Sequence, residues 1–207
     1  MSKFGILGGT FDPIHNGHLA LGMACAKELH LGRILLIPTA APPHKTAGET
    51  PAGHRLEMCR LAAEEFHGLS DFSFGVSDIE ILRGGKSYTS DTLPDLKKIY
   101  INADFHLIMG ADMFVTLRQW HQFEKLKETA VFCVCPRVGA YVPGHVLSEY
   151  ADGLKHDGCR VRIIPADLPE ISSSQIRKLI AQGKPVTGLI PESVERYIVE
   201  NGVYFTN

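Results

Sequence analysis

The stretch that most constrains the fold is the loop of residues 8–18, which joins an apolar run to a helical sequence. The run Phe4–Leu7 is typical of a short buried strand, and residues 19–27 have the composition of a helix. The loop begins with Gly8 and Gly9, whose backbone can approach a ligand closely. The helix that follows would point the positive end of its dipole at the same place. A strand, a glycine-rich turn and a helix in this order predict an anion site.

Two histidines, His15 and His18, distinguish this loop from commoner phosphate loops. The string has neither the three glycines of a dinucleotide-binding turn nor the Gly-Lys-Ser/Thr ending of a Walker loop. At a spacing of three residues, both rings can face the same side of the first helical turn. Asn16 is the expected helix cap, and Gly17 leaves room for a ligand. The spacing alone leaves open phosphate chemistry, a simple capped helix start and half of a metal site, although no His-Glu-x-x-His pattern is present.

Apolar runs alternate with helical segments along the whole chain. This alternation predicts an α/β fold with a doubly wound parallel sheet, in a single domain of residues 1–207 whose carboxyl-terminal helical part starts at about residue 172. A glycine-containing segment with little periodicity, residues 139–158, is expected to be a flexible insertion. The expected strands are residues 4–7, 33–38, 72–82, 105–109, 130–135 and 160–165, with Arg137 just past the end of the fifth.

Charge and cysteine content limit the partners and the compartment. The net charge of −2 gives no reason to expect a nucleic-acid partner, which usually needs a basic face. No apolar run is long enough to span a membrane. The five cysteines are odd in number and scattered, which favours reduced thiols in the cytoplasm. Whether the chain forms a homo-oligomer stays open.

Polar residues follow several of the expected strands, at the edge where parallel sheets bind ligands. Lys45 lies in a loop stiffened by Pro42 and Pro43. Asp112 follows the strand 105–109, where a carboxylate either accepts ribose hydroxyls or caps a helix. Trp120 either stacks on an aromatic ring or fills the core, and the residue type alone favours the core.

A second motif spans Ile171 to Arg177. Ser172 and Gln175 have the spacing of a capping box, so a helix is expected to begin here. Arg177 lies four residues beyond Ser173 and therefore on the same side of that helix. Hydroxyl, backbone N–H and guanidinium groups can converge on one polyphosphate, while a capped helix with a solvated arginine is the alternative.

The loop of residues 8–18 resembles the signature of the nucleotidyltransferases, Gly-x-Phe-Asp-x-x-His-x-Gly-His. The whole chain resembles bacterial nicotinate-nucleotide adenylyltransferases, through segments 8–18, 42–45, 87–89, 110–112, 120, 171–177 and 190–204. The resemblance implies a Rossmann-like fold and transfer of AMP from ATP to nicotinate mononucleotide, which gives nicotinate adenine dinucleotide and pyrophosphate in NAD biosynthesis. An adenylyltransferase for nicotinamide mononucleotide or another phosphorylated acceptor is one alternative. A non-catalytic nucleotide-binding regulator is the other.

The resemblance also implies roles for individual residues. The implied catalytic residues are His15, His18, Lys45 and Arg177. The implied ATP-binding residues are Gly8, Gly9, Thr10, Phe11, His18, Gly110, Asp112, Ile171, Ser172, Ser173 and Arg177. The implied nicotinate mononucleotide-binding residues are Thr39, Lys45, Thr89, Trp120, His121 and Arg137. Mg²⁺ would be carried mainly by the ATP phosphates, with no metal ligand expected from the protein.

Overall fold

The computed structural model describes residues 2–41, 50–68, 71–136 and 142–205. These residues form two compact units, which are described separately. Unit 1 consists of Met1–Leu7, Leu21–Ile34 and Tyr88–Leu168, and unit 2 of Gly8–Ala20, Leu35–Ser87 and Pro169–Asn207. The assignment of the whole chain to one domain stays a prediction.

Within the described residues, six strands form a sheet in the order β3-β2-β1-β4-β5-β6. β4 pairs in parallel with both β1 and β5, and β5 pairs in parallel with β6. Phe4 lies opposite Phe105, which in turn lies opposite Ala130. The order runs outward from β1 in both directions, as predicted for a doubly wound sheet. The strands are β1 (Lys3–Gly9), β2 (Arg33–Pro38), β3 (Ser73–Val76), β4 (Asp104–Gly110), β5 (Ala130–Cys135) and β6 (Val161–Ile163).

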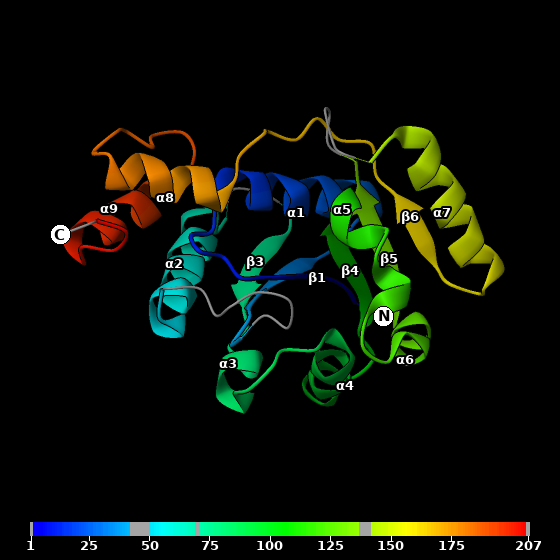
Figure 1. Cartoon of the computed structure of the whole chain (residues 1–207). Helices are drawn as coiled ribbons and strands as arrows, with labels where there is room; N and C mark the ends of the chain where they lie inside the picture. The colour runs from blue at the N-terminus through cyan, green and yellow to red at the C-terminus, as the bar shows by residue number, and fades with distance from the viewer. Residues whose placement is uncertain (1, 42–49, 69–70, 137–141, 206–207) are drawn as a thin grey trace. The chain divides into compact units, whose positions relative to one another are not determined.

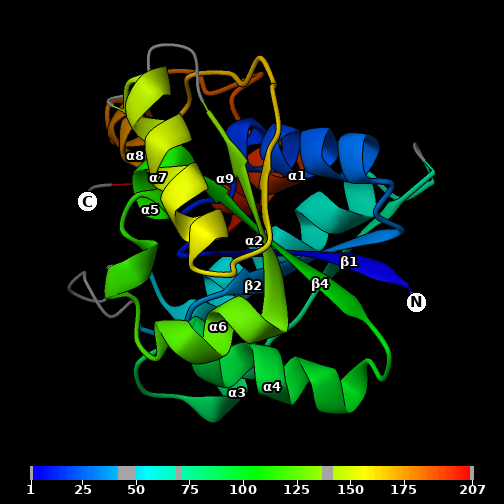
Figure 2. The ribbon, with the colours of Figure 1, turned by 90° about the vertical axis from the view of Figure 1, so that its right-hand side faces the viewer.

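Helices cover both faces of the strands in unit 1. Figure 2 shows α4 and α6 on one side of β4 and β5, and α1 and α7 on the other. Phe105 and Phe132 are fully buried between these layers, where burial of an aromatic ring contributes about 1.5–3 kcal/mol. The helices are α1 (Asn16–Leu29), which belongs to unit 1 from Leu21 onward, α4 (Thr89–Ile99), α6 (Phe123–Thr129) and α7 (Gly144–His156), with the short α5 (Ala111–Phe114) and η1 (Leu117–Gln119).

Unit 2 contains the carboxyl-terminal helices. α8 (Ser173–Ala181) and α9 (Glu192–Glu200) lie next to each other, and α9 packs on α2 (Ala52–Glu65) (Figure 1). The hydroxyl and backbone N–H of Ser193 both donate to the Glu65 carboxylate, at 2.6 and 2.9 Å, which ties the start of α9 to α2. The helical part expected from about residue 172 is therefore present.

Two expectations about secondary structure are wrong. Residues 72–82 do not form one strand, because β3 ends at Val76 and Ile79–Arg83 form the short helix α3. Residues 144–156 are not a flexible insertion but the helix α7. Its buried residues Leu147, Ala151 and Leu154 recur at helical spacing and hold it on the sheet.

Smaller differences concern the ends of strands. β1 continues through Gly8 and Gly9, which were expected to open the loop. β5 runs from Ala130 to Cys135, as expected, whereas β6 runs only from Val161 to Ile163 and is shorter than the expected strand 160–165. The apolar runs were recognised correctly, but flanking residues do not determine where pairing stops.

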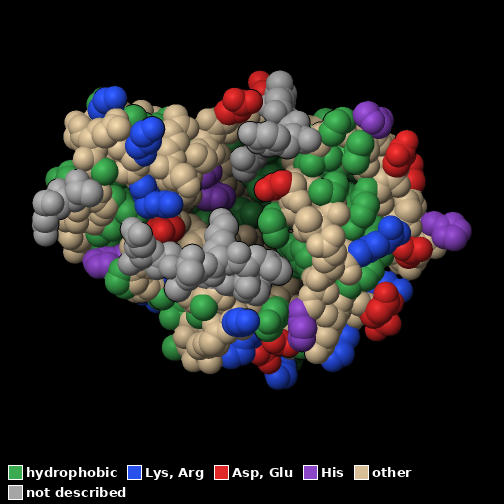
Figure 3. Space-filling model, viewed as in Figure 1, with side chains coloured by type: hydrophobic (Ala, Val, Ile, Leu, Met, Phe, Trp, Pro, Cys, Tyr) green, Lys and Arg blue, Asp and Glu red, His purple; other side chains and the backbone are tan. Residues whose placement is uncertain are grey.

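The five cysteines are free and buried, in agreement with the expected reduced thiols. None of the helices in the described residues is both long and apolar enough to cross a bilayer. On the face drawn in Figure 3, basic and acidic side chains are interspersed rather than separated.

Candidate active site

The histidine pair forms the start of α1 in unit 2. His15 precedes the first helical residue, and its ring Nδ1 accepts a hydrogen bond from the backbone N–H of His18 at 3.3 Å. In return, Nδ1 of His18 accepts from the backbone N–H of His15, also at 3.3 Å. This exchange has the geometry of a capping box, built from two imidazoles. His15 is therefore the cap, and the expectation that Asn16 caps the helix is wrong.

The reciprocal bonds select one tautomer for each neutral ring. A ring nitrogen that accepts a hydrogen bond carries no proton, so each neutral imidazole bears its proton on Nε2. The rings stack with centroids 3.7 Å apart and planes inclined by 22°, and Phe11 meets His18 edge to face at 5.0 Å. His15 is buried and His18 half-buried. The arrangement holds the His18 Nε2–H donor in one orientation.

The residues next to the two histidines, Asn16 and Gly17, hold this arrangement in place. A side chain at Gly17 would place its Cβ 3.0 Å from the His15 ring, so the space expected for a ligand is filled by that ring. The backbone N–H of Asn16 donates to Leu189 O at 2.9 Å, and its side-chain amide donates to Gly188 O at 2.9 Å. The first N–H of α1 is thus satisfied within the protein.

The second motif begins the helix α8, as predicted, and the start of this helix contacts the histidine loop. Ser172 caps α8 by accepting a hydrogen bond from the backbone N–H of Gln175 at 3.2 Å. The Ser173 hydroxyl donates to Pro13 O at 2.9 Å, and Nη1 of Arg177 donates to Asp12 O at 2.6 Å. Ile171, just before the cap, is buried. Within unit 2, Ser173 and Arg177 of α8 are therefore attached to the backbone of the loop that carries His15 and His18.

Asp12 sits at the centre of this cluster, although sequence reasoning assigned it no role. Its carboxylate accepts a hydrogen bond from the Tyr204 hydroxyl at 2.7 Å and lies 3.8 Å from Nη1 of Arg177. Asp12 is buried, and burial together with the hydrogen bond to Asp12 raises the pKa of Tyr204 far above its usual value. In the sequence, only the position of Asp12 within the motif could indicate a role, because Arg177 and Tyr204 are distant from it along the chain.

Replacement of Tyr204 by phenylalanine is expected to lower the free energy of unfolding by about 1–3 kcal/mol at neutral pH, because a buried carboxylate loses its donor. The folded state raises the pKa of Tyr204 above the unfolded value of about 10, so the contribution of Tyr204 to stability is complete below that pH and declines as the pH rises above it. The wild type should therefore lose its advantage over the variant by about 1.4 kcal/mol per pH unit above about pH 10.

Urea denaturation of both proteins at about pH 7 and about pH 11 measures this difference. If the difference in free energy of unfolding between the two proteins were the same at both pH values, the role of the Tyr204 hydroxyl would be contradicted. The comparison with the variant removes the contribution of the buried thiols of Cys59 and Cys133, whose pKa values are also raised by burial.

The ends of β1 and β2 meet in unit 2. The backbone N–H of Thr39 donates to Gly9 O at 2.9 Å, and the Thr39 hydroxyl is buried without a hydrogen-bond partner in the described part of the chain. Gly8, Gly9 and Thr10 are at least partly exposed, whereas Phe11 is buried and has a positive φ of 50°. Lys45 and Arg137, two of the predicted binding residues, lie outside the described residues.

In unit 1, Gly110 is the last residue of β4, and Asp112 lies two residues beyond it. Gly110 caps α5, and Asp112 lies in its first turn. Asp112 is exposed, and a Cβ on Gly110 would lie 2.8 Å from its carboxylate. The alternative in which Asp112 is the cap residue is therefore wrong, and its carboxylate stands at the sheet edge where ligands bind.

Trp120 ends the short helix η1 and does not belong to the core. It is half-buried, and its indole N–H donates to the Thr116 hydroxyl at 3.2 Å. The interpretation of Trp120 as a core residue is therefore wrong, and one polar edge of the ring is already fixed. A half-exposed, fixed aromatic ring is suited to stacking.

His121, next to Trp120, contacts the start of α4. Its ring stacks on Tyr88 with centroids 4.3 Å apart, and its Nδ1 lies 3.0 Å from the Ser90 hydroxyl. Thr89, the first residue of α4, lies between these two contacts in the sequence. Unit 1 thus brings the His121 ring against the residues on either side of Thr89.

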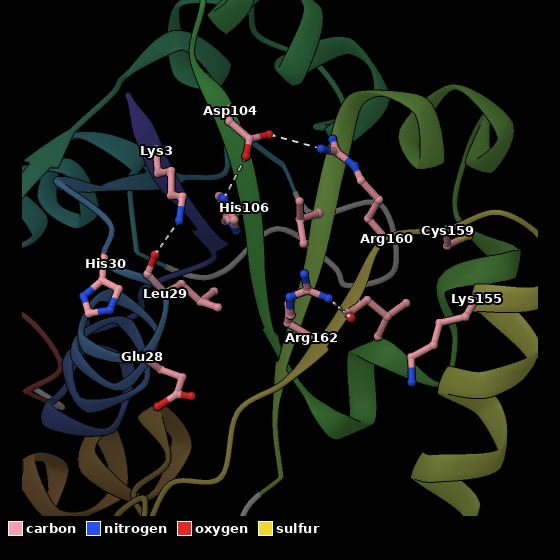
Figure 4. Close-up of a pocket in the computed structure, with 12 residues that line it drawn as sticks. Lys3, Glu28, Leu29, His30, Asp104, His106, Lys155, Cys159, Arg160 and Arg162 are labelled. Carbon is pink, nitrogen blue, oxygen red and sulfur yellow. Dashed lines mark hydrogen bonds and ion pairs between the residues drawn. The ribbon is translucent and has the colours of Figure 1, made fainter. Parts of the chain in front are cut away.

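A cavity of about 440 Å³ in unit 1 has none of these residues in its lining, which Figure 4 shows. Lys3, Asp104 and Arg160 stand at or next to the amino ends of β1, β4 and β6 and line this cavity. Ligands of parallel sheets bind at the carboxyl ends, where Gly110 and Asp112 lie. The Arg160 and His106 side chains are already paired with Asp104. The cavity is therefore not the substrate site.

Comparisons with known proteins agree with these features. Residues 6–179 match the family model described as "Cytidylyltransferase-like". The chain is 36% identical to "Probable nicotinate-nucleotide adenylyltransferase" of Thermomicrobium roseum, over 100% of this chain and 93% of the relative. It is 38% identical to the protein of the same name from Exiguobacterium sibiricum, over 99% of this chain and 100% of the relative.

A solved structure shares the fold. It is the Plasmodium falciparum nicotinic acid mononucleotide adenylyltransferase complexed with NaAD, with a TM-score of 0.75 and 20% identity. The match covers 99% of this chain and 98% of that one. Together with the full-length relatives and the histidine-containing loop, these findings show that the chain belongs to the nicotinate-nucleotide adenylyltransferase family.

Proposed function

We propose that this protein transfers AMP from ATP to nicotinate mononucleotide, giving nicotinate adenine dinucleotide and pyrophosphate. The observation that carries the proposal is the attachment of Ser173 and Arg177 to the loop that begins α1 with His15 and His18, in a chain of this family. These groups offer one cation and several donors to a polyphosphate. The product places the enzyme in NAD biosynthesis.

The reaction needs little from the protein beyond positioning and charge. A phosphate oxygen of nicotinate mononucleotide attacks the α-phosphorus of ATP, the bond from that phosphorus to the bridging oxygen breaks, and pyrophosphate leaves. The attacking phosphate is ionised at neutral pH, because its second pKa is about 6, so no general base is required. Donors aimed at the charge that develops in the transition state supply the rate.

Particular residues have particular roles in this proposal. His18 donates from Nε2 to the triphosphate, and His15 supports it from behind by stacking and capping. Arg177 neutralises phosphate charge while its bond to Asp12 O holds it at the loop. Asp112 accepts the ribose hydroxyls of ATP, and Trp120 stacks on the nicotinate ring. Lys45 completes the phosphate contacts.

Mg²⁺ enters the proposal as a companion of ATP. Within the part of the chain that the structure describes, no group of three His, Cys, Asp or Glu side chains is placed to hold a metal ion. A magnesium ion is commonly held by substrate phosphates and water, where it neutralises charge. We assign the magnesium ion to the ATP triphosphate. The buried free thiols support a reducing compartment, which we propose to be the cytoplasm.

Pyrophosphate release tests the function directly. The purified protein is incubated with Mg-ATP and, in parallel, nicotinate mononucleotide, nicotinamide mononucleotide or phosphopantetheine. A strong preference for nicotinate mononucleotide is expected. Equal or reversed preference would keep adenylyl transfer and remove the acceptor assignment. Absence of turnover with all three would favour a nucleotide-binding regulator.

Replacement of Trp120 by alanine is expected to raise the KM for nicotinate mononucleotide about 10-fold or more, because stacking on a base is worth about 1–3 kcal/mol. The KM for ATP should change little. Trp120→Phe retains a ring and should recover part of the affinity. Gln119→Ala, at the exposed neighbouring position, is the matched control. Steady-state kinetics with either substrate varied would refute the stacking role if Trp120→Ala and Gln119→Ala behaved alike.

A further inference from the structure

Arg55 on α2 is a buried cation that the reaction scheme does not use. It is 3% exposed, the lowest value among the Lys, Arg, Asp and Glu side chains of the described residues. Within the described residues, no carboxylate lies within ion-pair distance of the Arg55 guanidinium. Burial lowers the pKa of its guanidinium, and attraction to the nearby Asp12 carboxylate opposes that shift. Burying a guanidinium is unfavourable unless its donors are satisfied in a specific geometry.

The guanidinium satisfies its donors with backbone carbonyls from three segments. Nη1 donates to Thr10 O at 2.8 Å, Nη2 to Ala40 O at 3.2 Å, and Nε to Thr50 O at 3.2 Å. Thr10 lies in the loop after β1, Ala40 lies after β2, and Thr50 precedes α2. The three donors sit on three nitrogens of one planar group and so reach three separate carbonyls, whereas an ammonium group presents its three donors from a single nitrogen.

The joined segments are those that carry the predicted ligand contacts. Thr10 lies between Gly9 and Phe11, and Ala40 follows Thr39, whose N–H already donates to Gly9 O. The backbone N–H of Ala40 donates to the Ser87 hydroxyl at 3.0 Å. Arg55 therefore fixes the exits of two adjacent strands relative to each other, and it approaches both through backbone oxygens only.

We propose that Arg55 is a positioning residue that holds the loop after β1 in the conformation that binds the ATP phosphates. Arg55 acts through Thr10 and Ala40 and does not touch the substrate. The inference rests on the proposed function, because that function assigns the loop after β1 to the binding of ATP. It adds a buried residue of α2 to the set on which turnover depends.

Replacement of Arg55 by alanine is expected to lower kcat/KM for ATP by about 10- to 100-fold, in the range of one lost donor or misplaced contact group. Arg55→Lys keeps the charge but not the fork, so it should show nearly the same defect. Arg60→Ala is the matched control, because Arg60 lies on the same helix and its side chain is 53% exposed. It should retain wild-type kinetics.

Chemical rescue separates positioning from a general loss of stability. Methylguanidinium at millimolar concentration should occupy the site left by Arg55→Ala and restore kcat/KM at least severalfold, while methylammonium at the same ionic strength should not. Equal rescue by both cations, or wild-type kinetics in a folded Arg55→Ala or Arg55→Lys protein, would overturn the proposal. Loss of folding in both variants, without recovery by methylguanidinium, would also overturn it, since Arg55 would then be merely structural.

The same experiment distinguishes failure of this inference from failure of the proposed function. Wild-type turnover with nicotinate mononucleotide in the same assay reports on the proposed function. Calorimetric titration with ATP reports on the loop even when the acceptor assignment is wrong. Weaker ATP binding in Arg55→Ala, recovered by methylguanidinium, supports the positioning role in either case, and unchanged ATP affinity contradicts it.

Discussion

Replacement of His18 by alanine is expected to lower kcat by about 100-fold or more, because one preorganised donor to a charged transition state is typically worth that much. The ring is half-buried between His15 and Phe11, so its Nε2–H has little freedom to turn away from a bound phosphate. The KM for ATP should change less than kcat if the bond strengthens in the transition state. Pyrophosphate release at saturating substrate concentrations measures kcat.

A second substitution separates the two functions of His18. In His18→Asn, the side-chain oxygen lies near the position of Nδ1 and can still accept from the backbone N–H of His15, but no group replaces Nε2–H. This variant should unfold at the wild-type temperature and still lose turnover. Near-wild-type kcat in folded His18→Ala or His18→Asn would falsify the assignment of His18 as the donor.

Replacement of Arg177 by alanine is expected to lower kcat/KM for ATP by about 100-fold. The substitution removes a positive charge that would neutralise the phosphates, and it removes a hydrogen bond that holds the loop. The bond from Nη1 to Asp12 O is 2.6 Å long, and the side chain is 38% exposed, so the guanidinium reaches both loop and solvent. Arg177→Lys should be intermediate, because it retains the charge without the second donor direction.

Lys178 provides the control for this prediction. It is the next residue on α8 and is exposed, so Lys178→Ala removes one positive charge from the same helix without touching the loop. Its kinetics should stay within about twofold of the wild type, as for ordinary surface changes. If both variants lost activity equally, a general effect of charge would explain the result better than a specific role of Arg177.

The sheet could be predicted from the sequence because each strand is a short apolar run with turn residues beside it. The predictions of secondary structure failed where the residue pattern fitted neither a helix nor a strand clearly. Ile79 and Ile81 alternate like strand residues, yet five residues are too few to distinguish the two periods, and Ile79–Arg83 form a helix. In α7, Gly144 and Gly153 obscured the helical recurrence of its buried residues.

The site was predictable to the extent that it is local. The spacing of His15 and His18 placed both rings on one turn, and Ser172 capped α8 as expected. The exchange of hydrogen bonds between the histidines was not visible, because Asn is ordinarily the better cap. The burial of Arg55 has no local signal either, since its partners Thr10 and Ala40 are distant in the sequence.

The attachments of Asp12 and Pro13 have a consequence for the order in which the protein is made. The groups that hold this loop, Ser173, Arg177 and Tyr204, follow it by 160, 165 and 192 residues. A ribosome therefore releases the histidine loop long before it releases the groups that hold it. Nascent chains that have not yet passed α8 therefore lack the contacts of Ser173 and Arg177 with the backbone of this loop.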